Sequence, residues 1–86
     1  MLRISILQSS SQAVTLLVEG EVRGRWVAEL GRACEESLTR DVHLILDLTG
    51  VSFIDANGID LFRTLKERDV GFANASSFIA DQLGGS

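Results

Sequence analysis

Apolar and polar residues alternate in two short runs near the N-terminus. The apolar members are Leu2, Ile4 and Ile6 in the first run, and Val14, Leu16 and Val18 in the second. A period of two is typical of β-strands with one buried face, and the polar residues 9–12 between the runs are turn formers. We predict an antiparallel hairpin whose first, weaker strand lies at an edge of the sheet.

The period changes after Gly20. From Arg23 to Thr39 the apolar positions fall at helical spacing, which predicts an amphipathic helix. Its inner face would carry Val27, Leu30, Cys34 and Leu38. The next apolar run, Val42 to Leu48, is too short for a typical helix and predicts a strand buried on most of both faces. Residues 49–55 are predicted to form a loop.

The C-terminal part predicts three further elements. A second helix begins near Gly58, residues 70–73 form a short fourth strand, and Ser76 or Ser77 caps a last short helix. Residues 84–86 form a disordered tail. The order ββαβαβα predicts an α/β fold, with a single mixed four-stranded sheet and helices mainly on one face, in one domain spanning residues 1–86.

Composition narrows the possible functions. The 86-residue chain has a net charge of -4, and its eight basic residues form no stripe, which argues against nucleic acid or an anionic membrane surface as a partner. No segment is long and apolar enough to span a membrane, so we expect a cytoplasmic protein without membrane insertion. One cysteine and one histidine do not make a usual zinc site, and no cofactor is expected.

The stretch LDLTGVSFIDANGIDLF, residues 46–62, carries the most information. It resembles the STAS (sulfate transporter and anti-sigma-factor antagonist) family. Domains of that family have a buried strand ending in Asp-Leu-Ser/Thr, then a loop with an aromatic residue, then Asp-Ser-Ser-Gly at the start of a helix. The matching residues here are Asp47, Leu48, Thr49, Phe53, Asp55 and Gly58.

One departure from the family pattern concerns phosphorylation. The resemblance implies that the second Ser of Asp-Ser-Ser-Gly is phosphorylated by a partner kinase. Asn57 occupies that position here and Ala56 precedes it, so neither side chain has a hydroxyl. The serine switch therefore does not carry over, although Ser52 and Thr49 lie nearby as other possible phosphosites. Asn57 is itself a good helix N-cap, and we predict that it caps the second helix.

The resemblance also implies a binding surface. It would consist of Phe53, Asp55, Ala56, Asn57 and Gly58, at the end of a buried strand. Asp55 equally suits a structural role, in which its carboxylate accepts hydrogen bonds from backbone N–H groups.

The sequence leaves four candidate functions to be compared. The first is a protein-interaction module that binds a kinase-like anti-sigma factor, as anti-sigma-factor antagonists do. The second is a small cytoplasmic subunit that braces the ATPase of an ABC-type transport system. The third, a nucleotide-binding sensor, would hold an anion at the Gly58 helix start, near which the sequence shows no basic residue. The fourth, an enzyme, lacks any constellation of nucleophile and base.

Overall fold

The computed structural model describes residues 1–83, so the tail predicted for residues 84–86 lies outside the described residues. Seven elements follow in the predicted order ββαβαβα. They are β1 (Leu2–Ser9), β2 (Ala13–Val22), α1 (Arg25–Leu38), β3 (His43–Ile54), α2 (Ala56–Glu67), β4 (Gly71–Ala73) and α3 (Ser77–Gln82).

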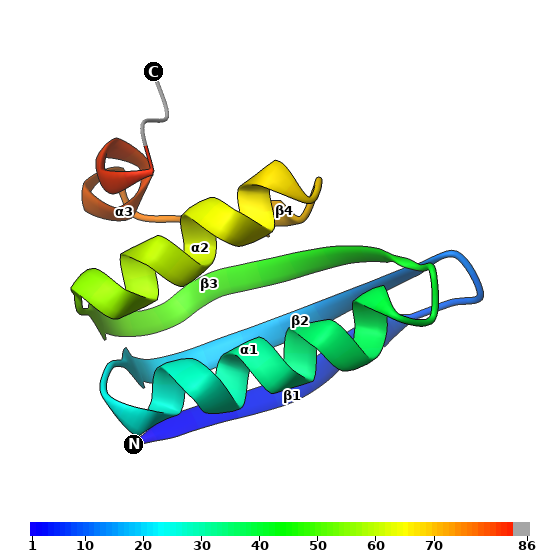
Figure 1. Ribbon diagram of the computed structural model, residues 1–86, viewed down its shortest axis with the longest axis horizontal. Helices are drawn as coiled ribbons and strands as arrows, with labels where there is room; N and C mark the ends of the chain where they lie inside the picture. The colour runs from blue at the N-terminus through cyan, green and yellow to red at the C-terminus, as the bar shows by residue number, and fades with distance from the viewer. Residues whose placement is uncertain (84–86) are drawn as a thin grey trace.

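The four strands form one sheet in the order β1-β2-β3-β4 (Figure 1). β1 pairs with β2 antiparallel, whereas β2 with β3 and β3 with β4 pair in parallel. The predicted hairpin, the mixed sheet and the edge position of the first strand are therefore confirmed.

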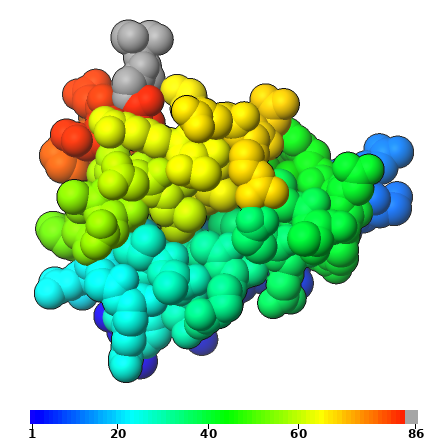
Figure 2. Space-filling view, viewed as in Figure 1, coloured from blue at the N-terminus to red at the C-terminus, as the bar shows by residue number. Residues whose placement is uncertain are grey.

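The helices α1 and α2 cover one face of the sheet, and in Figure 2 their side chains hide most of the strands. The core lies between these layers. Its buried apolar side chains are Val14, Leu16, Val18, Val22, Leu30, Cys34, Leu44, Leu46, Leu48, Ile54, Ile59, Phe62, Leu65, Val70 and Ile79. The predicted role of Cys34 as a buried thiol is confirmed, and burial raises its pKa to about 12.

The predicted loop over residues 49–55 is wrong, because β3 continues to Ile54. Its second half pairs with the end of β2, which runs past Gly20 to Val22. Two register shifts each insert an extra residue into β3, and such bulges break the alternation that identifies a strand in sequence. Gly20 permits the β2 extension at a φ of 102°, where a Cβ would lie 2.2 Å from the carbonyl oxygen of Met1.

β4 and α3 lie on the side of β3 that β2 does not occupy. β4 pairs only with residues 45–47, and α3 lines a pocket together with Val51, Phe53 and Ile54 of β3. Ser76 caps α3 by accepting a hydrogen bond from the Ile79 N–H, as predicted.

Candidate functional site

The site lies at the edge of the sheet where β2 and β3 end. Val22 and Ile54, the last residues of these parallel strands, are register partners. Parallel strands end at the same edge, so α1 begins beside α2. The loops that leave such an edge are where binding residues concentrate in α/β proteins.

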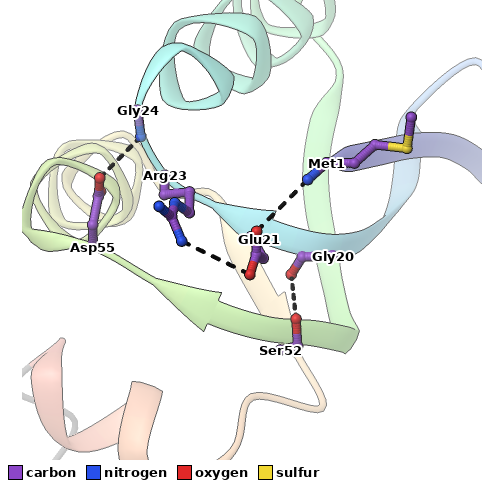
Figure 3. Close-up of polar contacts among 7 residues, drawn as sticks. All are labelled: Met1, Gly20, Glu21, Arg23, Gly24, Ser52 and Asp55. Atoms are coloured by element: carbon purple, nitrogen blue, oxygen red, sulfur yellow. Dashed lines mark hydrogen bonds and ion pairs between the residues drawn. The ribbon is translucent and has the colours of Figure 1, made fainter.

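Asp55 joins the two helix starts. One carboxylate oxygen, Oδ2, accepts from the Gly24 N–H at 3.0 Å, as Figure 3 shows. The other, Oδ1, accepts from the Gly58 N–H at 2.8 Å. The bonds to Gly24 and then Gly58 hold the pKa of the Asp55 carboxyl below its usual value, against a smaller opposing effect of desolvation. The Arg23 guanidinium lowers this pKa further.

The predicted N-cap at Asn57 is therefore wrong, because Asp55 is the cap and α2 begins at Ala56. Asn57 is the second residue of the helix and is exposed. Because α2 begins at Ala56, Asp60 lies outside the first turn of this helix. The structural role predicted for Asp55 is confirmed, because its carboxylate accepts hydrogen bonds from backbone N–H groups.

Gly58 is buried against the end of β2. A Cβ at this position would lie 2.7 Å from Cγ1 of Ile54 and 2.9 Å from the carbonyl oxygen of Val22. The absence of a side chain thus lets α2 start directly against the sheet edge. Gly58 contributes to the position of the site, while Phe53, Ala56 and Asn57 form its exposed part.

Two residues that the sequence did not connect to the site also lie there. The guanidinium carbon of Arg23 is 5.7 Å from the centroid of the Phe53 ring, within the range of a cation–π contact. Phe78 lines the same pocket as Phe53 and is 62% exposed. The sequence could have placed Arg23 at the site, because Arg23 directly follows β2, and β2 and β3 are parallel and end at the same edge. No sequence signal places Phe78 there, because the position of α3 depends on tertiary packing.

The nearby hydroxyl groups are engaged within the fold. Ser52 Oγ donates to the Gly20 carbonyl oxygen at 3.2 Å (Figure 3), and Thr49 Oγ1 donates to Asp47 Oδ1 at 2.6 Å. Among residues 1–83, no group of three His, Cys, Asp or Glu side chains is placed to hold a metal ion. Within the same residues, no helix is long and apolar enough to cross a membrane.

No family model and no curated protein sequence matches the chain. Among solved structures, it is similar to the anti-sigma factor antagonist SpoIIAA in its unphosphorylated form, with a TM-score of 0.69 over 96% of this chain and 82% of that chain. This chain has a STAS-like fold. At 15% sequence identity the likeness concerns the fold, and it confirms the architecture expected from residues 46–62.

Proposed function

We propose that this chain is a non-catalytic protein-interaction domain that acts in the manner of an anti-sigma-factor antagonist. It binds a regulatory protein through Phe53, Ala56 and Asn57, which Asp55 and Gly58 hold in place. The observation that carries the proposal is the exposed aromatic and amide surface at the start of α2, built on a rigid pair of strand ends.

Asn57 gives this surface one fixed state. In the resembling family, phosphate at this position adds charge and bulk and so blocks the partner. Asn57 carries no nucleophilic oxygen and no charge, so this surface stays permanently in the form that corresponds to the unphosphorylated domain. A kinase-like partner would bind it without modifying it there.

The occupied helix starts argue against the nucleotide-sensor alternative. An anion at a helix N-terminus needs unpaired N–H groups. The N–H groups of Gly24 and Gly58 already donate to the Asp55 carboxylate. The nearby Arg23 corrects the expectation that no basic residue lies here, but its charge is shared with Asp55 and Glu21.

A transporter ATPase is the other partner class. The helical layer supports it with a separate surface, a largely apolar groove between α1 and α2 that is lined by Ala28, Gly31, Leu61 and Thr64 among others. An ATPase lying along this groove would not need the Asn57 surface, so the two functions predict different sensitive residues.

The experiment is a pull-down from the native cell, followed by titration of the recovered partner. Asn57→Asp adds a carboxylate of nearly the same size, which would be desolvated in the interface without a counter-charge. We expect binding at least about tenfold weaker and an unchanged thermal melt. Gln12→Glu makes the same chemical change at the exposed hairpin turn and should leave binding unchanged.

Equal affinities of wild type and Asn57→Asp for the recovered partner would remove Asn57 from the interface. If Gly31→Leu in the helical groove then abolished binding, the transporter function would replace the one proposed. Turnover of ATP or GTP that Asp55→Ala abolishes would overturn the non-catalytic assignment.

A further inference from the structure

Arg23 is an exposed cation beside the site. Its side chain is 56% exposed, and its ion pair with Glu21 is long, at 3.9 Å. Other arginines are bound more closely: Arg32 reaches Glu29 and Arg68 reaches Glu35, each at 2.6 Å. Within residues 1–83 the Arg23 guanidinium makes no hydrogen bond, so its planar fork is available to a carboxylate.

An apolar pocket adjoins this cation through the Phe53 ring. Phe53 and Phe78 are 48% and 62% exposed, and both line the pocket with Val51, Ile54 and Ile79. Phe53 thus has Arg23 near its face and the pocket beside it. Exposed aromatic side chains that gather next to an arginine are typical of the residues that dominate binding energy in protein interfaces.

We propose that Arg23, Phe53 and Phe78 bind a partner segment in which a carboxylate lies next to an apolar side chain. The carboxylate would pair with the Arg23 fork, and the apolar side chain would enter the pocket between the two phenylalanines. This inference rests on the proposed function, because it states the chemistry of the partner that the same surface accepts.

Charge complementarity favours a carboxylate on a protein over a free phosphate. The carboxylates of Glu21 and Asp55 flank Arg23 and repel any anion, so a singly charged carboxylate meets less of this repulsion than a doubly charged phosphate does. The helix N–H groups that would help to hold a phosphate are bound to Asp55. A single carboxylate needs only one guanidinium, and the neighbouring pocket supplies the rest of the contact.

A displayed library of random linear peptides, selected on the purified chain, tests the inference without the natural partner. We expect the selected peptides to carry Asp or Glu beside a large apolar residue. Changing that acid to its amide should weaken binding to the wild type about tenfold, which corresponds to ~1.4 kcal/mol. The same change should have little effect on binding to Arg23→Gln, because the two groups act as a pair.

Matched variants define the surface. Phe78→Ala should weaken binding about tenfold or more, whereas Ile6→Ala, at an apolar side chain of β1 that is equally exposed, should not. Arg40→Gln removes an exposed arginine beyond the other end of α1 and serves as the control for charge. Thermal melts of all variants confirm that they are folded.

The inference is overturned if no peptide is selected, if the selected peptides lack an acid, or if the acid matters equally for wild type and Arg23→Gln. None of these results touches the proposed function, which is decided by the natural partner and Asn57→Asp. Conversely, a partner insensitive to Asn57→Asp would refute the proposed function even if the peptide cycle gave the expected coupling.

Discussion

The two halves of β3 belong to one strand but have different surroundings. Residues 43–47 pair with β2, and residues 45–47 among them also pair with β4. The side chains of Leu44, Leu46 and Leu48 are buried under the helices. Residues 49–54 pair with β2 through two bulges, and α3 in place of a strand lines the other side. Ser52 and Phe53 of this half are exposed.

The difference shows how a small domain presents a surface without a long loop. The first half is fixed by the core, and the second half extends from it as a paired strand that carries Phe53 to the start of α2. Side chains on such an extension are positioned by the sheet, so the proposed partner would meet a surface that needs little ordering on binding.

The largest expected effect is on the core half. Leu46→Ala removes a fully buried side chain between β2 and β4 and should lower the free energy of unfolding by about 2–5 kcal/mol. Phe53→Ala, in the other half, should cost about 1 kcal/mol or less, since Phe53 is half exposed. Urea unfolding measures both, and equal losses would contradict the contrast between the halves.

The next largest effect on stability is expected at Gly58, where the second half of β3, residues 49–54, leads into α2. Gly58→Ala puts a Cβ 2.9 Å from the Val22 carbonyl oxygen, where the backbone cannot easily move, so we expect a loss of about 1–3 kcal/mol. Gly31→Ala is the control within α1, because its Cβ would meet only Leu61 Cδ1, at 3.7 Å. That change should stabilise the protein by about 0.5–1 kcal/mol. A Gly58→Ala protein as stable as the wild type would refute the packing at Gly58.

The Asp55 junction should contribute to the acid sensitivity of the fold. Its pKa is lowered from 3.8, so its carboxylate stabilises the fold above that pH, and this contribution is lost as the pH falls below 3.8. Asp55→Asn should therefore lower the melting temperature at neutral pH and flatten the decline in acid. The pKa values of Asp47 and Glu35 are also lowered, so part of the decline should remain in the variant.

The control for this pH experiment is Asp60→Asn, which removes an exposed carboxylate from the same helix. Melting curves across the acid range compare the three proteins. If Asp60→Asn flattened the acid decline as much as Asp55→Asn did, net charge would explain the result and the junction would not.

The last prediction concerns phosphorylation, for which we expect no change at position 57. A cognate serine kinase with ATP should place no phosphate at position 57, since Asn57 has no hydroxyl. Mass spectrometry would map any label. Stoichiometric phosphate at Ser52 or Thr49, both in the exposed half of β3, would mean that the switch has moved along the strand.

The sequence predicted those elements whose periodicity is unbroken. The alternation over Val14 to Val18 and the helical spacing through Leu30 and Cys34 led to the correct sheet and helix layer. The second half of β3 was not predicted, because its two bulges break the alternation and Gly50 and Ser52 are residue types common in loops.

The candidate site was predicted only in part. The family resemblance points to residues 53–58 as a binding surface, which stays a prediction. The N-cap predicted at Asn57 is Asp55. Both residues are good caps, and only the start of α2 at Ala56 decides between them. Arg23 and Phe78 come from distant parts of the chain, so they join the site only through the fold.

The short pairing of β4 has a consequence for hydrogen exchange. β4 is held by a ladder of three residue pairs, and α3 by the buried Ile79 and by Arg63, which donates to the Gln82 carbonyl oxygen at 2.8 Å. Opening this unit breaks few contacts, so its amides should exchange with solvent before those of β2 and β3. A partner seated against Phe78 would slow that exchange, and protection over residues 71–83 would then report binding from a part of the molecule that few contacts hold.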